Sequence, residues 1–146
     1  MIPKKSLGQN FLIDKNICKK IVNLIDIKNK IVIEIGPGTG QLTKEIILNK
    51  PKKIILIEKD VNLYKNLIKN YEHHDIIDFY NLDALNFDYS KYNNIFLISN
   101  LPYNMSLKII YKLLSYNNNI KKMILMVQKE VAEKLQYKKN NKMNKH

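Results

Sequence analysis

The stretch from Ile31 to Gly40 constrains the fold more than any other part of the sequence. An apolar run ends there in glycines at alternate positions, 36, 38 and 40. Glycine allows positive φ angles and the close approach of a ligand, because it has no Cβ atom. The residues after Gly40 resemble a helix start, where the first N–H groups have no partner within the helix. A strand, a tight turn and a helix in this order form the ligand-binding crevice of open α/β sheets.

The spacing of these glycines differs from two common phosphate-binding motifs. The dinucleotide pattern G-x-G-x-x-G would need a glycine at position 41, where the chain has Gln41. A P-loop would need Gly-Lys-Ser/Thr after the turn, and this sequence is absent. We interpret the turn as a ligand site of another kind. The alternative interpretation is a tight turn without a ligand.

Apolar strands alternate with amphipathic helices along the rest of the chain, as in parallel βαβ units. We therefore predict an α/β fold with a Rossmann-like, doubly wound and mostly parallel sheet. The predicted strands are 31–35, 53–58, 76–80, 95–99 and 123–127, and the predicted helices start after Asp14, Gly40 and Asp60, near Leu107 and near Gln128. Residues 1–135 form one predicted domain, and 136–146 read as a frayed, polar and basic tail.

Charge and cysteine content narrow the class of protein. The chain has 25 basic residues, all of them lysine, against 13 acidic ones, and its net charge of +12 favours a nucleic-acid partner. A biased, AT-rich coding sequence is the alternative source of the lysines. The single cysteine, Cys18, excludes an internal disulfide and a cysteine-based metal cluster, and its apolar neighbours predict a buried thiol. We expect no metal site. No run approaches the roughly 20 apolar residues of a membrane span, so we expect a soluble protein. The N-terminus lacks the apolar core of a signal peptide, so the cytoplasm is the expected compartment, with an organelle as the alternative, and we expect a monomer.

Polar residues follow the predicted strands where a crevice is expected. Glu58 ends the second strand about twenty residues beyond the turn, where an acid can accept hydrogen bonds from both hydroxyls of a ribose. The structural alternative is a carboxylate that pairs with Lys59 or with another lysine. After the third strand, Asp83 can accept a hydrogen bond from an adenine amino group, with Ala84 among the apolar residues beside the ring. An ordinary Asx turn explains Asp83 equally well.

The fourth strand ends in Asn100-Leu101-Pro102-Tyr103, which we interpret as functional rather than as a structural turn. Asn100 supplies an amide acceptor, Leu101 a carbonyl oxygen, and Tyr103 a flat face for stacking a base. Pro102 stiffens the backbone between them.

Several of these motifs, in this order, resemble the ribosomal RNA adenine dimethyltransferases. The resemblance covers residues 2 to about 135, and its residues are Lys5 to Leu12, Glu34 to Gly40, Ile57 to Asp60, Asp83 to Leu85, Asn100 to Tyr103 and Val127 to Ala132. The opening Lys-Ser-Leu-Gly-Gln-Asn-Phe-Leu and the Asn-Leu-Pro-Tyr motif are more similar to the small-subunit dimethyladenosine transferases than to the erythromycin-resistance methylases, which act on large-subunit RNA.

The resemblance implies a function and a role for each matched residue. The implied cofactor is S-adenosylmethionine, and the implied substrate is the exocyclic amine of adenosines in small-subunit ribosomal RNA. Its cofactor-binding residues would be Gln9, Asn10, Leu12, Gly36, Gly38, Glu58, Asp83, Ala84 and Asn100, and its catalytic residues Asn100, Leu101, Pro102 and Tyr103. Asn100 would bridge the cofactor and the target base, on which Tyr103 would stack.

The sequence departs from the family after about Leu135. The family continues there with two further strands, a second aromatic residue near the adenine and a small RNA-binding helical domain, whereas this chain has lysines and asparagines. We therefore expect an incomplete catalytic domain with an uncovered sheet edge. Two alternatives to the small-subunit enzyme stay open. One is a binding module for RNA or ribosome assembly without turnover, and the other is a large-subunit methylase of the macrolide-resistance type.

Overall fold

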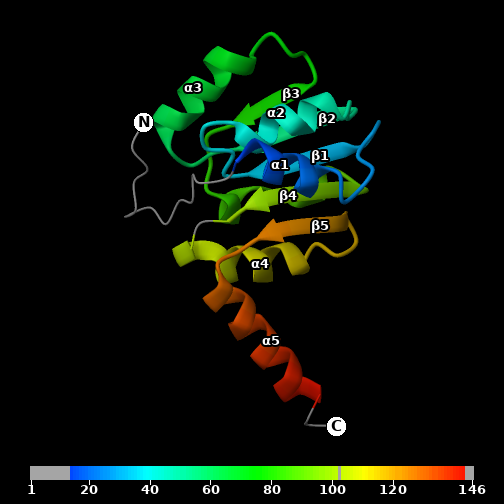
Figure 1. Cartoon of the computed structure of the whole chain (residues 1–146), viewed down its shortest axis with the longest axis vertical. Helices are drawn as coiled ribbons and strands as arrows, with labels where there is room; N and C mark the ends of the chain where they lie inside the picture. The colour runs from blue at the N-terminus through cyan, green and yellow to red at the C-terminus, as the bar shows by residue number, and fades with distance from the viewer. Residues whose placement is uncertain (1–13, 102, 144–146) are drawn as a thin grey trace.

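The computed structural model describes residues 14–101 and 103–143, which form a parallel sheet with helices on both faces (Figure 1). The five strands are arranged in the order β3-β2-β1-β4-β5. They are β1 (Ile31–Ile35), β2 (Lys53–Ile57), β3 (Ile77–Tyr80), β4 (Ile95–Asn100) and β5 (Ile120–Met126). The helices are α1 (Lys15–Val22), α2 (Gln41–Leu48), α3 (Val61–Tyr71), α4 (Ser106–Leu114) and α5 (Lys129–Met143), with short 3₁₀ turns η2 (Ala84–Asn86), η3 (Tyr89–Lys91) and η4 (Tyr103–Met105). The predicted doubly wound parallel sheet is confirmed.

Aspartate side chains start two of the helices as predicted. The Asp14 carboxylate accepts a hydrogen bond from the Ile17 N–H at 2.8 Å and caps α1. Asp60 caps α3 by accepting from two N–H groups of the first turn at 2.9 and 3.0 Å. Each cap satisfies donors that the helix leaves unpaired, which is worth about 1 kcal/mol.

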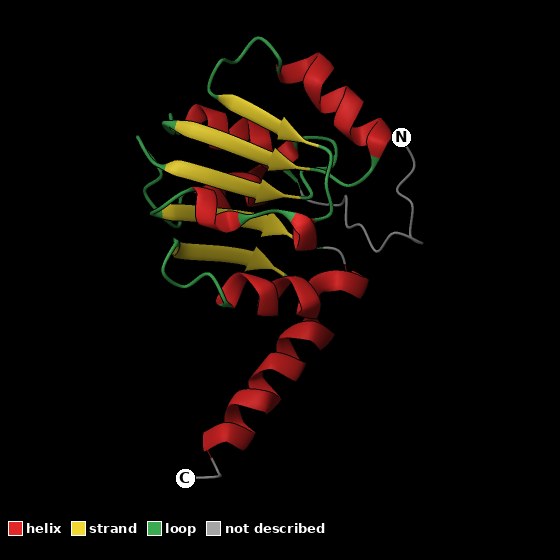
Figure 2. Ribbon diagram, turned by 180° about the vertical axis from the view of Figure 1, so that it is seen from behind, coloured by secondary structure: helices red, strands yellow, loops and turns green. Residues whose placement is uncertain are grey.

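The side chains of each strand alternate between two apolar cores. One core lies between the sheet and the helices α1, α2 and α3, and it contains Val32, Leu56 and Ile98. The other lies on the opposite face, which Figure 2 shows, and joins Ile33, Ile57 and Leu97 to α4, η2 and the start of α5. Both faces of the inner strands are therefore buried, which explains their unbroken apolar sequences.

The first helix buries only some of the apolar residues in and beside it. Cys18 is buried as predicted, together with Ile21, so the thiol belongs to the core. Ile17 is 44% exposed, and Leu24 lies beyond the end of α1 and is 69% exposed. Apolar spacing alone does not show which residues a neighbouring element will cover.

The fifth strand begins earlier than predicted. It starts at Ile120 instead of 123, and its register against β4 shifts between Ile95 and Phe96. The strand start is not recognisable as an apolar run, because Lys121 and Lys122 follow Ile120 and are exposed. Among the described strands β5 is outermost on its side of the sheet, and charged residues are common on such edges because they discourage pairing with other chains.

The last helix extends further than predicted. α5 continues to Met143, so the prediction of a frayed segment from residue 136 is wrong for 136–143. Lysine and glutamine favour helices, and no glycine or proline interrupts this segment. Val131 is buried in the core, and Leu135 packs against the same core. Beyond these contacts α5 points away from the sheet (Figures 1 and 2). None of the helices in the described part of the chain has the length and apolar character needed to cross a membrane.

Candidate active site

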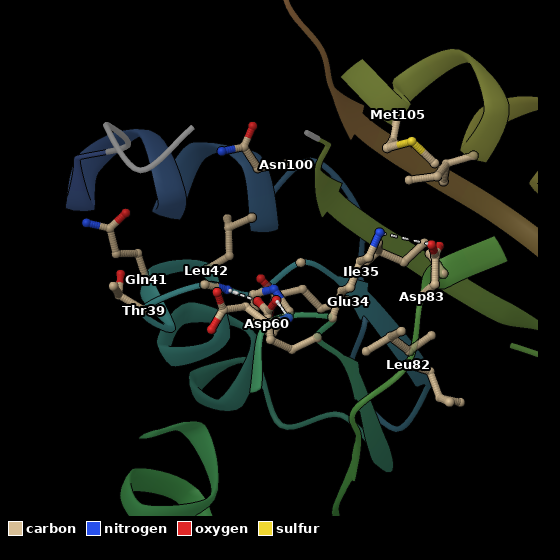
Figure 3. Close-up of a pocket in the computed structure, with 18 of the residues that line it drawn as sticks. Glu34, Ile35, Thr39, Gln41, Leu42, Asp60, Leu82, Asp83, Asn100 and Met105 are labelled. Atoms are coloured by element: carbon tan, nitrogen blue, oxygen red, sulfur yellow. Dashed lines mark hydrogen bonds and ion pairs between the residues drawn. The ribbon is translucent and has the colours of Figure 1, made fainter. Parts of the chain in front are cut away.

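A cavity of about 330 Å³ lies at the carboxyl ends of β1, β2 and β4 (Figure 3). Figure 3 shows Thr39 and Gln41 toward one end of the cavity, and Leu82, Asp83 and Met105 toward the other. β1 lies between β2 and β4, and the chain runs from β1 to α2 on one face of the sheet but from β4 to α4 on the opposite face. Ligands of doubly wound folds bind at such a switch point. The predicted crevice is therefore present.

The glycine turn forms one wall of the cavity and is tied to neighbouring elements. The Gly36 N–H donates to the Ile57 carbonyl of β2 at 2.8 Å, and the Tyr71 hydroxyl of α3 donates to the Gly40 carbonyl at 3.3 Å. Gly36 and Gly40 have φ angles of 65° and 89°, in the region that favours glycine. A Cβ atom on Gly40 would lie 3.0 Å from the Tyr71 ring. The turn therefore needs glycine for its backbone conformation and for its packing.

We expect Gly40→Ala to lower the free energy of unfolding by about 1 to 3 kcal/mol, because alanine is strained at this φ angle and meets the Tyr71 ring. Urea unfolding followed by circular dichroism measures the change. Lys44→Ala, at an exposed position of the same helix, is the control and should change stability by less than about 0.5 kcal/mol. Equal stability of the two variants would contradict the prediction.

Glu58 joins the glycine turn to the start of α3. It is 2% exposed, and its two carboxylate oxygens accept from the Gly38 N–H at 3.0 Å and the Asp60 N–H at 2.9 Å. Burial raises the pKa of Glu58, and these two hydrogen bonds oppose the rise. Lys59 pairs with Asp83 instead of Glu58, so Lys59 is not the partner that the structural alternative named first. Each carboxylate oxygen can accept a further hydrogen bond, for instance from a hydroxyl group facing the cavity.

Asp83 forms the Asx-type turn that was the structural alternative for it. One oxygen accepts from the Leu85 N–H at 2.9 Å, and the other lies 3.3 Å from the Lys59 ammonium group. Lys59 is 71% exposed in this pair, so the pair contributes little to stability. Ala84 is buried, and both residues line the cavity with the half-exposed Leu82. A role for Asp83 in ligand binding stays a prediction.

Of the described residues in the Asn100–Tyr103 motif at the end of β4, Asn100 lines the cavity, whereas Leu101 and Tyr103 do not. Asn100 is half-buried and lines the cavity. Leu101 is buried in the core, and its N–H donates to the Met126 carbonyl of β5 at 3.0 Å. Tyr103 is 45% exposed, and neither Leu101 nor Tyr103 belongs to the cavity wall. Asn100 is thus the residue of this motif that the fold brings to the glycine turn.

Some of the predicted site residues lie outside the described part of the chain. These are Gln9, Asn10, Leu12 and Pro102, and their roles stay predictions. Gly36, Gly38, Glu58, Asp83, Ala84 and Asn100 all line the cavity. Within the described residues, no group of three or more histidine, cysteine, aspartate or glutamate side chains is placed to hold a metal ion.

Glu34 is a wall residue to which the sequence reasoning assigned no role. It is 1% exposed, and the Thr43 hydroxyl of α2 donates to its carboxylate at 2.5 Å. Burial raises the pKa of Glu34 to about 8, and the nearby Glu58 adds to the rise. The signal in the sequence is an acidic residue within an otherwise apolar strand, directly before the glycine turn. At neutral pH the Glu34 carboxyl is therefore largely protonated in the folded chain.

The free energy of unfolding is expected to fall as the pH rises from about 4.5 to about 8, because the unfolded chain loses the Glu34 proton first. Below this range both states hold the proton, and above it the full penalty of a buried charge is present. Glu34→Gln should flatten this dependence, which urea unfolding between these pH values would measure. Glu72→Gln, at an exposed position, should keep the wild-type dependence. A Glu34→Gln profile parallel to that of the wild type would contradict the prediction.

The Ribosomal RNA adenine dimethylase family model matches residues 3–146, nearly the whole chain. The chain belongs to this family. Among its relatives, the ribosomal RNA small subunit methyltransferase A of Hydrogenobaculum sp. (strain Y04AAS1) is 47% identical over 135 residues, which cover 91% of this chain and 52% of the relative. The protein of the same name from Mycoplasmopsis synoviae (strain 53) is 46% identical over 144 residues, covering 95% of this chain and 54% of the relative. The chain thus spans about half the length of these curated relatives.

Two solved structures of similar proteins have the same fold. A dimethyladenosine transferase from Plasmodium falciparum matches with a TM-score of 0.75 and 35% identity, covering 87% of this chain and 46% of that chain. The 23S rRNA methyltransferase ErmE also matches with a TM-score of 0.75, at 26% identity, covering 84% of this chain and 50% of that chain. The shared fold confirms that the cavity lies in a Rossmann-like methyltransferase domain.

Proposed function

We propose that this chain is the catalytic part of an S-adenosylmethionine-dependent enzyme that dimethylates the exocyclic amine of adenosines in small-subunit ribosomal RNA. The observation that carries the proposal is the convergence of Gly36, Glu58 and Asn100, from the ends of three strands, on one cavity. The names of the relatives at 46% and 47% identity support the small ribosomal subunit as the source of the RNA.

The cavity residues fit a nucleoside cofactor with a charged amino-acid tail. The Glu58 carboxylate, held by two backbone N–H groups, would accept hydrogen bonds from the ribose hydroxyls. Leu82 and Ala84 offer apolar contacts for an adenine ring, and Asp83 offers an acceptor for its amino group. Gly36 and Gly38 line the cavity, and without side chains they would let the methionine part approach the backbone of the turn. When bound, S-adenosylmethionine supplies a methyl group already activated by its sulfonium charge.

The end of β4 would prepare the target amine for methylation. The lone pair of an adenine amine is delocalised into the ring, which makes the amine a poor nucleophile. Acceptors at the Asn100 side chain and the Leu101 carbonyl would bind the amine hydrogens and favour its pyramidal, nucleophilic geometry. Tyr103, exposed beside the cavity, would stack on the base. Positioning and electrostatics then suffice, and no side chain needs to act as a general base before the methyl group moves.

The RNA must present its adenosine outside a base stack. The cavity is bounded by strand ends and cannot admit a paired base within a helix, so a loop or an unpaired adenosine is the expected target. The excess of lysine side chains attracts the RNA backbone, mainly through point charges.

Transfer of labelled methyl groups from S-adenosylmethionine to unmethylated small ribosomal subunits tests the proposal. Digestion of the RNA to nucleosides should then show label in dimethyladenosine. The same assay with large ribosomal subunits maps the target, and label only in their RNA would favour a methylase of the macrolide-resistance type instead. A folded chain that binds the cofactor but transfers no methyl group would contradict catalysis and favour the binding-module alternative.

A further inference from the structure

Lysine side chains gather at the amino ends of the strands, whereas the cavity lies at their carboxyl ends. In a parallel sheet, all strands point the same way, as Figure 2 shows. The segments that lead into the strands therefore lie at one end of the sheet, and the segments that follow the strands lie at the other end. The entering segments of β1 and β2, and the first residues of β5, contribute six exposed lysines, which we name the lysine rim. These are Lys28, Lys30, Lys50, Lys52, Lys121 and Lys122.

Backbone contacts hold the first two segments of the lysine rim side by side. The Lys52 N–H donates to the Lys30 carbonyl at 2.8 Å, and the Asn29 N–H donates to the Lys50 carbonyl at 3.0 Å. Asn29 and Lys50 both have positive φ angles, of 59° and 55°, so these turns are tight. The four lysines of these two segments therefore lie near one another, although they are separated by α2 in the sequence.

The third segment joins the lysine rim through β4. Lys122 pairs with Phe96 of β4, and the Lys30 ammonium group lies 5.8 Å from the centre of the Phe96 ring. Lys121 occupies the register shift beside this pair. The rim thus extends across the sheet from β2 to β5.

Little negative charge offsets the lysine rim. In the part of the chain that the structure describes, none of the six lysines forms an ion pair, whereas the neighbouring Lys53 pairs with Asp78 at 2.8 Å. Asp26 is next to the rim in sequence and accepts a hydrogen bond from the Lys28 N–H, and the exposed Asp75 precedes β3, beside the start of β2. The C-terminus of α2 at this end of the sheet adds about half a negative charge, far less than six lysines carry. Positive charge therefore predominates on the rim.

We propose that the lysine rim is a second RNA-contacting surface, which binds the phosphate backbone of RNA without reading its sequence. The choice of RNA as the polyanion rests on the proposed function. Lysine forms point-charge contacts with phosphates instead of the bidentate contacts that read base edges. A strand of five residues separates the rim from the cavity, roughly 17 Å. An RNA must span at least this distance to contact both the rim and the cavity, so the rim favours a long or folded substrate over a fragment of a few nucleotides.

Binding of a fluorescein-labelled, blunt RNA duplex of roughly 20 base pairs, measured by anisotropy at about 50 to 300 mM KCl, tests the proposal. Such a duplex has no unstacked adenosine for the cavity, so it reports backbone contacts. The rim variant is Lys30→Gln with Lys52→Gln, and the matched control is Lys65→Gln with Lys69→Gln on the exposed face of α3. Both variants remove two charges, and thermal unfolding checks that both fold.

The rim variant should lower the slope of log affinity against log salt by roughly 1.5, and weaken binding at least about 10-fold near 100 mM KCl, because two phosphate contacts are lost. The control variant should keep the wild-type slope. Equal slopes for the two variants would overturn the proposal. A second result would also overturn the proposal: binding to vesicles of phosphatidylserine and phosphatidylcholine that is tighter than RNA binding and depends on the same lysines. Together with Leu24 and Leu48, which are exposed near the ends of α1 and α2, such binding would indicate a membrane partner.

Methyl transfer to small ribosomal subunits, measured on the same samples, separates this proposal from the proposed function. A wild-type chain that transfers methyl groups while its two variants bind the duplex alike would retain the function and overturn the rim. In the opposite case, the wild-type chain transfers no methyl groups and only the rim variant loses affinity for the duplex. This result would support the rim as an RNA-binding surface and overturn the proposed methyltransferase function.

Discussion

Replacing Asn100 by alanine is expected to lower the rate of methyl transfer by roughly 100- to 1000-fold, because the target amine loses an acceptor that acts on its hydrogens in the transition state. Asn100 is the last residue of β4 and lines the cavity beside the glycine turn. Its backbone is held in register with β5, where Asn100 pairs with Met126. Removal of the side chain should therefore leave the strand intact.

Single-turnover transfer to small ribosomal subunits measures the effect of Asn100→Ala, and calorimetry measures its affinity for the cofactor. We expect the affinity to change less than about 10-fold, since the loss falls on the reacting amine. Asn100→Asp keeps an acceptor oxygen at this position and should retain more activity than the alanine variant. Asn62→Ala, on the exposed face of α3, should transfer at the wild-type rate. Full activity of Asn100→Ala would remove this residue from the mechanism.

Replacing Glu58 by alanine is expected to weaken the binding of S-adenosylmethionine by roughly 100-fold or more, because two charge-assisted hydrogen bonds to the ribose are lost. The variant also leaves the Gly38 and Asp60 N–H groups without the acceptors that they have in the folded chain. We therefore expect a loss of stability of about 1 to 3 kcal/mol in addition.

Isothermal titration with S-adenosylmethionine measures the affinity of Glu58→Ala at a temperature where circular dichroism shows that it is folded. Glu58→Gln has the same shape but only one acceptor oxygen, so its affinity should lie between those of the alanine variant and the wild type. Glu133→Ala, at an exposed position of α5, should bind as the wild type does. Wild-type affinity in a folded Glu58→Ala chain would show that the carboxylate serves only the turn.

The local features of the fold were predictable because each depends on residues close in sequence. Asp14 and Asp60 mark helix starts, since their side chains bond to N–H groups two or three residues away. The inner strands are recognisable as apolar runs, since both of their faces are buried. The start of β5 and the end of α5 were predicted wrongly, because lysine is compatible with an edge strand and with a helix alike.

The candidate site was predictable in part for the same reason. Strand ends are identified locally, and in a parallel sheet they share one edge, so Glu58 and Asn100 were expected near the glycine turn. The exposure of Tyr103 and the burial of Leu101 could not be derived from the sequence, since they depend on how the chain packs after β4. Met105 lines the cavity without any signal in the sequence.

The sequence by itself determined the strand, turn and helix around Gly36, the caps, and the set of polar residues that end the strands. Only the tertiary structure decided that Tyr71 packs on Gly40, that Thr43 bonds to the buried Glu34, and that the lysine rim forms from three separate segments. The physical reason is that hydrophobic periodicity shows which face of an element is buried, but not which element covers it. Strand order and register bring distant residues together, and they are properties of the assembled sheet.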